Sequence, residues 1–293
     1  MARVAWIGLG VMGYPMAGHL KRRGGHDVVV YNRSSSKAEK WCREFGGEAA
    51  PTPAEAARGC EAIFACVGND DDVRSVTVGP AGAFETMSPG SIFIDHTTTS
   101  AHLARELSSA ARSRDLYFLD CPVSGGQSGA EAGALTVMAG GEHAAFVRAE
   151  PLIMSFAKSV RHLGPSGSGQ LAKMANQIAI AGLLQGLAEA IHFAECAGLD
   201  IEALIATISK GAAQSWQMEN RWKTMHLRQF DFGFAVDWMR KDLAICLDEA
   251  AANGADLAIT RQVDGYYAEV QALGGNRWDT SSLIARLQPK TRR

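Results

Sequence analysis

Paired cysteines are absent from this sequence, and so are the residue clusters that usually hold metals. No two of the six cysteines form a C-x-x-C pair or join histidines at zinc spacing: Cys42, Cys60, Cys66, Cys121, Cys196 and Cys246. This spacing excludes a zinc-stabilised domain and gives no indication of a disulfide framework. Reduced thiols in a cytoplasmic protein are the simplest interpretation, and we expect no bound metal.

Net charge is also small. The 29 lysines and arginines nearly balance the 31 aspartates and glutamates, which leaves a formal net charge of -2. A chain so balanced has no overall attraction to nucleic acid or to an anionic membrane surface. The sequence therefore favours a small molecule as the binding partner.

Uninterrupted apolar runs of membrane-spanning length are lacking. The most apolar stretch, residues 170–197, is interrupted by five polar or charged side chains: Lys173, Gln177, Gln185, Glu189 and Glu195. We interpret it as a long interior helix, which would span roughly 40 Å at about 1.5 Å per residue. A strand pattern begins almost directly after Met1, so we expect no signal or transit peptide ahead of the fold.

The pattern of the sequence changes near residue 164. Before this point short apolar runs alternate with helical periodicity, and after it nearly every segment is helical. This order predicts an α/β fold. A Rossmann-type doubly wound domain over residues 1–164 is followed by an all-helical domain over residues 165–293, joined by the long interdomain helix. Within the first half we expect a strand over residues 62–67 and then a loop from residues 68–70.

The first strand pattern, residues 4–7, leads directly into a G-x-G-x-x-G motif and a helix. Its glycines are Gly8, Gly10 and Gly13, with Met12 just before the last. The first permits a tight turn, the second lets the backbone approach a pyrophosphate, and the third allows a helix to pack closely on the strand. Because the motif stands between a strand and a helix, it predicts a dinucleotide site at the helix N-terminus.

The second strand pattern, residues 27–31, ends at Asn32, Arg33 and Ser34 instead of at an acid. An acid at this point would bind the ribose 2′-hydroxyl of NAD. Its absence removes repulsion against a 2′-phosphate, and the Arg33 guanidinium fits such a phosphate. We therefore expect Asn32, Arg33 and Ser34 to bind the cofactor. That cofactor is NADP, with NAD as the alternative if Arg33 is only an exposed turn residue.

Two further turns carry small hydroxyl side chains next to predicted strand ends. Thr98 follows one such strand, where the carboxyl edge of a parallel sheet would meet the cofactor. Ser124, Gly125 and Gly126 follow the next one, and their backbone N–H groups would suit a substrate carboxylate. Taken alone, the second segment is also compatible with an ordinary glycine-rich turn.

The long helix carries one lysine, Lys173, three residues before Asn176, so both side chains lie on the same face. An ammonium and an amide near a glycine-rich entry indicate a candidate active site. A lysine of ordinary pKa, about 10.4, is protonated near neutral pH and can act as an acid. The alternative is that Lys173 extends its ammonium to solvent, as most helix lysines do.

Four segments together resemble the β-hydroxyacid dehydrogenase family, which includes 3-hydroxyisobutyrate dehydrogenases, tartronate semialdehyde reductases and glyoxylate/succinic semialdehyde reductases. They are residues 8–17 (GLGVMGYPMA), 120–126 (DCPVSGG), 164–176 (GPSGSGQLAKMAN) and 241–243 (KDL). They occur in order over essentially the whole chain. The resemblance implies the two-domain fold described above, with the helical domain forming the subunit contact of a homodimer or homotetramer.

The resemblance also implies roles for the residues of the first domain and the long helix. Ser124, Gly125 and Gly126 would bind the substrate carboxylate. Lys173 would be the catalytic acid or base, and Asn176 would orient the substrate for it.

The remaining implied contacts come from both halves of the chain. Thr98 would contact the nicotinamide region from the first half. From the helical half, Phe234 and Asp242 would complete the substrate site and Lys241 would contact the cofactor. The segment after the second strand is similar to that of the NADPH-using reductases of the family, whereas members that use NAD carry an acid there.

These features predict an NADP-dependent oxidoreductase that transfers hydride between the nicotinamide and a short β-hydroxyacid or its semialdehyde. Two alternatives remain, namely an imine reductase and a noncatalytic dinucleotide-binding protein of the same fold. Imine reductases typically lack both the lysine and the Ser-Gly-Gly turn, and a noncatalytic relative would be expected to lose the lysine. Lys173 and the turn at Ser124 therefore favour the hydroxyacid dehydrogenase.

Overall fold

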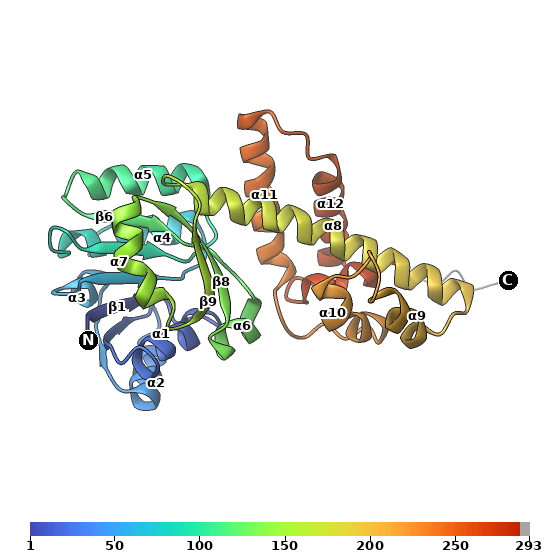
Figure 1. The fold of residues 1–293 in the computed structure, drawn as a ribbon, viewed down its shortest axis with the longest axis horizontal. Coiled ribbons are helices and arrows are strands. Elements are labelled where there is room, and N and C mark those ends of the chain that lie inside the picture. Colours follow the sequence, from blue (N-terminus) through green and yellow to red (C-terminus); the bar gives the residue numbers. More distant parts are fainter. Residues whose placement is uncertain (288–293) are drawn as a thin grey trace. The chain divides into compact units, whose positions relative to one another are not determined.

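The computed structural model describes residues 1–287 and divides the chain into two compact units (Figure 1). The first unit runs from Met1 to Lys173, and the second begins at Met174. The division falls inside one long helix, α8 (Ser168–Ala197). Each unit has a hydrophobic core of its own.

The first unit is built on one sheet, in which nine strands lie in the described residues. Their order is β3-β2-β1-β4-β5-β6-β8-β7, with β9 beside β8. The strands are β1 (Arg3–Ile7), β2 (Asp27–Tyr31), β3 (Glu48–Ala49), β4 (Ala62–Ala65), β5 (Ile92–Asp95), β6 (Tyr117–Asp120), β7 (Val123–Ser124), β8 (Leu135–Gly141) and β9 (Ala157–His162). The pairs from β3 to β6 are parallel, whereas β8 is antiparallel to β6 and β7. This doubly wound order confirms the predicted Rossmann-type domain.

Helices cover both faces of this sheet, because its central strands are apolar on both sides. One face packs against α1 (Gly13–Arg22), α2 (Ser35–Phe45), α6 (Gly126–Ala132) and α7 (His143–Ile153). The other face packs against α3 (Pro53–Ala57), α4 (Asp70–Thr77), the 3₁₀ turn η1 (Ala83–Glu85) and α5 (Ala101–Arg112). The fully buried Trp6 and Phe64 stack on the first face, and Phe156 meets both rings edge-on.

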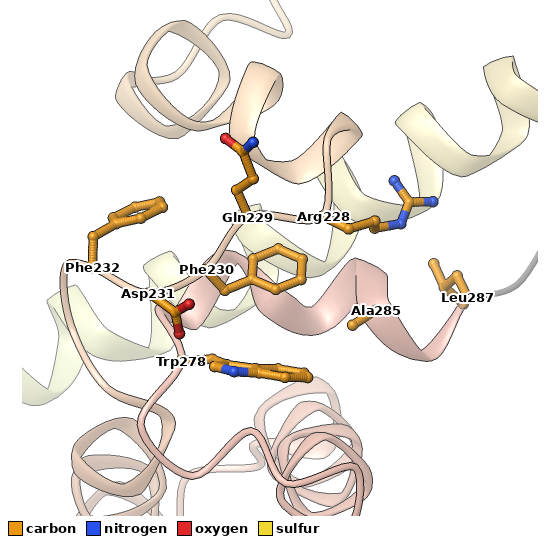
Figure 2. A pocket seen from close by; sticks show the side chains of 8 residues that line it. All are labelled: Arg228, Gln229, Phe230, Asp231, Phe232, Trp278, Ala285 and Leu287. Atoms are coloured by element: carbon orange, nitrogen blue, oxygen red, sulfur yellow. The ribbon is translucent and has the colours of Figure 1, made fainter.

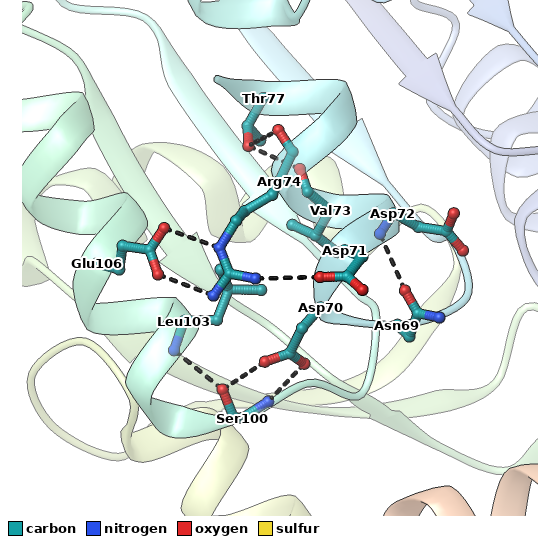
Figure 3. Close-up of polar contacts among 10 residues, drawn as sticks. All are labelled: Asn69, Asp70, Asp71, Asp72, Val73, Arg74, Thr77, Ser100, Leu103 and Glu106. Carbon is teal, nitrogen blue, oxygen red and sulfur yellow. Dashed lines mark hydrogen bonds and ion pairs between the residues drawn. The ribbon is translucent and has the colours of Figure 1, made fainter. Parts of the chain in front are cut away.

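The loop expected from residues 68–70 is present at Gly68 and Asn69, but the prediction is wrong at Asp70, where helix α4 begins. Asn69 caps this helix by accepting the N–H of Asp72 with its side-chain oxygen at 2.9 Å. The Arg74 guanidinium donates two hydrogen bonds to the Glu106 carboxylate of α5, and both N–O distances are 2.9 Å (Figure 3). Asparagine followed by three aspartates is a helix-start signal as well as a turn signal, and here the helix is fixed by its contact with α5.

The second unit is helical throughout its described secondary structure, as predicted. Besides the rest of α8 it contains α9 (Ile201–Ile208), α10 (Trp216–His226), α11 (Val236–Asn253), α12 (Ala258–Ala272) and the 3₁₀ segment η2 (Thr280–Arg286). Buried side chains of α8 such as Leu184 and Ile191 pack with Met239, Leu243 and Tyr267 in a single core. This core requires long-range contacts between helices that no local pattern specifies.

Helix α8 is long and apolar enough, by length and composition, to cross a membrane. In its most apolar window 44% of the residues are buried inside the protein. A core helix of a globular protein passes the same test, so the composition of α8 is weak support for a membrane span.

Candidate functional site

The glycine motif forms a tight turn at the carboxyl end of β1. Gly8 has a φ of +94°, and a Cβ on it would lie 2.3 Å from the Cys66 carbonyl oxygen. A Cβ on Gly13 would lie 2.0 Å from the Gly8 carbonyl oxygen, whereas one on Gly10 would meet nothing within 4 Å among the described residues. Gly8 and Gly13 are therefore required by the turn itself, and Gly10 leaves room for a ligand to approach the backbone.

The N-terminus of α1 is suited to a phosphate group. Met12 stands at the N-cap, and no side chain in residues 1–287 caps the helix there. The first turn carries no acidic residue among these described positions, so nothing opposes an anion. The turn is held by Trp6, whose ring N–H donates to the Gly8 carbonyl at 2.9 Å. These features fit the pyrophosphate of a dinucleotide.

The segment after β2 lies beside this turn, and its three predicted cofactor residues have different roles in the structure. Asn32 braces the backbone: its side-chain oxygen accepts the Leu9 N–H at 2.9 Å, and its amide donates to the Ser34 carbonyl at 3.0 Å. The Arg33 side chain is 91% exposed, with its guanidinium 3.8 Å from Asp72. Ser34 stands at the N-cap of α2, where no described side chain caps the helix. Arg33 and the start of α2 therefore offer positive potential next to each other.

The loop that carries Thr98 is fixed to the neighbouring strand ends. Thr97 accepts the N–H of Val67 with its hydroxyl oxygen at 3.0 Å and donates its own N–H to Asp95 at 2.9 Å. Two residues after Thr98, Ser100 is bound through its backbone N–H and hydroxyl to the carboxylate of Asp70 (Figure 3). The structure thus places Thr98 at the carboxyl edge of the sheet.

Two titratable groups are buried under this loop. Burial raises the pKa of Asp95 to about 7, against the hydrogen bonds from Thr97, which lower it. Burial lowers the pKa of His96 to about 4, and its Nδ1 lies 2.6 Å from the Cys121 carbonyl oxygen. The imidazole is therefore neutral near pH 7, whereas Asp95 is close to half ionised.

The raised pKa of Asp95 has a consequence for stability. The native state holds this proton more tightly than the unfolded chain, so the stabilisation is complete below about pH 4 and is lost as pH rises through about 7. Asp95→Asn removes this titration while keeping an acceptor for Thr97. We expect its free energy of unfolding, relative to wild type, to rise between pH 5 and 8 by on the order of 1 kcal/mol per pH unit. Urea unfolding at the two pH values measures it, and an equal difference at both contradicts it.

The Ser124 turn connects β7 to helix α6, which the sequence analysis did not predict. Gly125 has a φ of +132°, which a residue with a side chain rarely adopts, and Gly126 begins the helix. Ser124 is partly exposed and Gly126 is exposed. No described side chain caps α6, so the backbone at Gly125 and Gly126 faces solvent rather than a protein acceptor.

The start of α8 is anchored on the sheet by a buried carboxylate. Asp120 accepts the backbone N–H groups of Gly167 and Gln170 at 2.8 and 3.0 Å, and burial raises its pKa to about 6. A Cβ on Gly169 would lie 2.3 Å from the Asp120 carbonyl oxygen, so only glycine permits this approach. The sequence analysis missed Asp120 as an anchor, although its place at a strand end was a usable signal.

Lys173 lies one turn after this anchor and is only 8% exposed. Most of the surface of this side chain therefore lies inside the protein. A lysine packed in this way, five residues after the helix begins at Ser168, has a side-chain stem fixed by its surroundings. This is the arrangement that a proton donor requires.

In the second unit the predicted residues belong to a polar network on α8 and α11. Asn176 donates to the side-chain oxygen of Gln177 at 2.9 Å, and Gln177 donates to Asp242 at 2.7 Å. Asp242 is 2% exposed, and its other oxygen lies 3.2 Å from the Lys241 ammonium. Gln177, which joins Asn176 to Asp242, was not identified from the sequence because its partner is 65 residues away.

Phe234 is held through its backbone. Its N–H donates to Asp279 at 2.9 Å, and its carbonyl accepts the N–H of Thr280 at 2.9 Å. Gly233 is required beside it, since a Cβ there would lie 2.0 Å from the Asp279 carboxylate. Arg221 contacts the same carboxylate at 3.4 Å.

The second unit also has a cavity of about 680 Å³ (Figure 2). Phe230, Phe232 and Trp278 supply its aromatic wall, and Arg228 and Asp231 its charged groups. None of the predicted site residues lines it. This cavity is therefore not the site that the sequence motifs indicate.

Two family models match consecutive parts of the chain. Residues 3–164 match the NAD binding domain of 6-phosphogluconate dehydrogenase. Residues 167–287 match the model described as NAD-binding of NADP-dependent 3-hydroxyisobutyrate dehydrogenase. Together the two matches span nearly all of the described structure.

Individual relatives agree with these models. An uncharacterised oxidoreductase of Shewanella frigidimarina is 59% identical over 288 residues, which cover 98% of this chain and 99% of the relative. The probable mitochondrial 3-hydroxyisobutyrate dehydrogenase-like 1 protein of Arabidopsis thaliana is 38% identical over 287 residues, which cover 98% and 85%. The similarity thus extends over whole chains.

Solved structures show the same architecture. The 3-hydroxyisobutyrate dehydrogenase of Mycobacterium tuberculosis, solved with L-serine, has a TM-score of 0.89 and 29% identity, covering 98% of this chain and 99% of its own. An imine reductase from Pseudomonas sp. is more distant, with a TM-score of 0.59 and 20% identity, covering 98% and 99%. At that identity the second likeness concerns the fold alone.

Proposed function

The chain belongs to the β-hydroxyacid dehydrogenase family and is an NAD(P)-dependent dehydrogenase of that family, and on this premise we propose that it uses NADP(H) with a short β-hydroxyacid or its semialdehyde. The observation that carries the proposal is the buried Lys173, held one turn after an anchored helix start. A lysine ammonium at this position would supply the proton that reduction of a carbonyl needs.

In the proposed reaction the cofactor supplies the hydride chemistry, and groups of this chain bind the substrate and transfer the proton. The bound nicotinamide supplies or accepts the hydride. The Ser124 hydroxyl and the N–H groups of Gly125 and Gly126 hold the substrate carboxylate and so orient the carbonyl. Lys173 polarises the carbonyl oxygen as an ammonium and donates its proton to the alkoxide as it forms. In the oxidation direction the neutral amine of Lys173 removes the proton from the alcohol.

The remaining predicted residues support this chemistry in the proposal. Asn176 orients the substrate, and Phe234 and Asp242 bind it. Thr98 contacts the nicotinamide region and Lys241 contacts the cofactor. The network from Asn176 through Gln177 to Asp242 supports these assignments, because it fixes the rotamers of side chains that would otherwise be mobile.

The preference for NADP is supported by the segment after β2. It has no acid for the ribose hydroxyl, and the exposed Arg33 guanidinium stands next to the uncapped start of α2. A 2′-phosphate would accept hydrogen bonds from both. The family model over residues 167–287, which is described by an NADP-dependent enzyme, agrees with this preference.

Ser124→Ala tests the carboxylate site. Losing one hydrogen bond to a charged group weakens substrate binding by on the order of 2 kcal/mol, so we expect the KM for the acid to rise about tenfold or more. The dissociation constant of NADPH, measured by fluorescence titration, stays nearly unchanged. Ser128→Ala, one turn further and exposed, is the matched control. If NADPH affinity collapses in Ser124→Ala instead, the turn belongs to the cofactor.

An imine reductase and a noncatalytic binding protein are the alternatives to this function. Neither of these functions needs a lysine packed at position 173, and neither needs the Ser124 turn. A panel of short aldehyde-acids against cyclic imines, followed by NADPH oxidation, separates the three. Turnover of the imines alone would support the reductase, and turnover of neither would support the binding protein.

We also propose that the protein is a cytoplasmic homodimer or homotetramer joined through its helical units. Leu183 and Phe193 of α8 are 45% and 72% exposed. Gly186 lies between them, and a glycine inside a helix destabilises it by about 0.5–1 kcal/mol relative to alanine. A Cβ at this position would meet nothing within 4 Å in the described chain, so packing within the chain does not require glycine here. A second helix that approaches closely would account for this glycine and cover the exposed side chains.

Light scattering tests the assembly. At micromolar concentration we expect at least a dimer for the wild type. Phe193→Asp should shift the protein toward the monomer, because it places a charge in the proposed contact. Glu202→Ala, an exposed change on α9, serves as the control. A monomeric wild type contradicts the proposal.

A further inference from the structure

Gln170, in the first turn of α8, joins the Lys173 helix to the Thr98 loop. It is fully buried. Its side-chain oxygen accepts the Thr99 N–H at 3.1 Å, and its side-chain amide donates to the Thr97 carbonyl at 2.8 Å. The side chain therefore binds the backbone on both sides of Thr98, as a neighbouring strand would.

Thr97 in this loop also makes contacts with the sheet. Thr97 is bound to Val67 after β4 and to Asp95 on β5. The Gln170 side chain is thus a hydrogen-bonded link from α8 to this loop. Its backbone N–H is itself fixed by Asp120.

Lys173 follows Gln170 by three residues on the same buried side of α8. The helical turn that joins Gln170 to Lys173 is held by its own backbone hydrogen bonds, so the positions of the two residues relative to each other are fixed. A displacement of the Thr98 loop relative to Gln170 is therefore also a displacement relative to Lys173. Hydride and proton transfer depend on such placements to within about 1 Å.

We propose that Gln170 is a positioning residue that holds the Thr98 loop at a fixed place relative to Lys173. The inference rests on the proposed function, in which Thr98 contacts the nicotinamide region and Lys173 the reacting oxygen. Glutamine suits this position because its amide presents one donor and one acceptor side by side. Those two groups match the carbonyl of Thr97 and the N–H of Thr99.

Gln170→Met keeps the length of the side chain and removes both hydrogen bonds. It leaves two buried backbone groups without their partners, which costs free energy and favours movement of the loop. The matched control is Gln185→Met, since Gln185 is also buried on α8 but binds Glu189 on the same helix.

The first readout needs no cofactor. In Gln170→Met we expect the amides of residues 97–99 to exchange with deuterium at least tenfold faster than in the wild type. Gln185→Met leaves their exchange unchanged. Unchanged exchange in Gln170→Met contradicts the link itself.

The second readout is kinetic. We expect kcat per folded molecule to fall by about 10–100-fold in Gln170→Met, while the dissociation constant of NADPH changes less than about threefold. The hydride-transfer isotope effect in single turnover, measured with 4-deuterated NADPH, should rise because the transfer step becomes slower. A role limited to stability would lower the unfolding midpoint and leave kcat per folded molecule unchanged, and that result overturns the proposal.

Gln170→Glu gives a conservative comparison. A protonated carboxyl offers the same donor and acceptor, but an ionised one repels the Thr97 carbonyl. We expect its kcat relative to wild type to be highest at the lowest pH, whereas the relative kcat of Gln170→Met does not vary in this way. Three other titratable groups lie close to Gln170 through these contacts or in the sequence, namely Asp95, Asp120 and Lys173. All three are present in every variant. A pH-independent ratio for Gln170→Glu contradicts the proposed pairing.

Turnover of an aldehyde-acid by the wild type is measured first. If the wild type reduces none, the proposed function fails and the exchange readout alone decides whether Gln170 holds the loop. If the wild type is active and Gln170→Met keeps full kcat, the positioning role fails while the proposed function stands.

Discussion

Replacing Lys173 with alanine is expected to lower kcat by about 10²–10⁴-fold in both directions, the range typical of general acid–base catalysis. No other residue from 168 to 176 has a titratable side chain, so none in this turn takes over the proton transfer. NADPH should still bind, because the glycine turn at Gly8 and the start of α1 lie more than 150 residues before Lys173 in the sequence.

The measurement is steady-state kinetics with an aldehyde-acid and, in reverse, with the hydroxyacid. Lys158→Ala is the matched control, since Lys158 on β9 is exposed. Circular dichroism verifies that both variants are folded. A folded Lys173→Ala protein with kcat within a few-fold of wild type rejects the role of Lys173 and the mechanism proposed from it.

Reversing the charge at Arg33 is expected to change cofactor preference by about two orders of magnitude. A hydrogen-bonded charge pair with the 2′-phosphate contributes about 1.5–3 kcal/mol, and Arg33→Asp replaces that attraction with repulsion. The KM for NADPH should therefore rise far more than the KM for NADH. Asp72, which lies 3.8 Å from the guanidinium, would lose its partner in the same variant.

Arg58→Asp makes the same change of charge at an exposed position at the end of α3. It should leave the ratio of kcat/KM for the two cofactors unchanged. Equal effects of Arg33→Asp on NADPH and NADH, or a wild type that prefers NADH, contradict the assignment of NADP.

Local patterns were sufficient for the fold class and for the glycine turn. Gly8 and Gly13 are required by backbone contacts within a few ångströms, and these follow from the strand–turn–helix motif alone. The starts of the capped helices also depend on residues close in the sequence, as at Ser100, whose hydroxyl accepts the Leu103 N–H. Helix α4 was missed because the sequence at its start resembles a turn. The contact between Arg74 and Glu106 of α5 stabilises this segment as a helix.

The partners of the residues that hold the site in place were not visible in the sequence. Asp120, Gln170 and Gln177 each act through partners 47 to 73 residues away. A buried carboxylate or amide has no periodic signature, so only the fold shows which backbone groups it satisfies. Asn32, which was predicted as a cofactor residue, also has a structural role that the sequence did not indicate, because its side chain is bound to the backbone of Leu9 and Ser34.

The most direct test of the account is the rate of NADPH oxidation by the wild type and Lys173→Ala with a panel of short aldehyde-acids and cyclic imines. The account predicts that the wild type reduces one or more aldehyde-acids and none of the imines, and that Lys173→Ala reduces the same aldehyde-acids at least a hundredfold more slowly. Reduction of imines alone by the wild type, or equal rates for the two proteins, would contradict it.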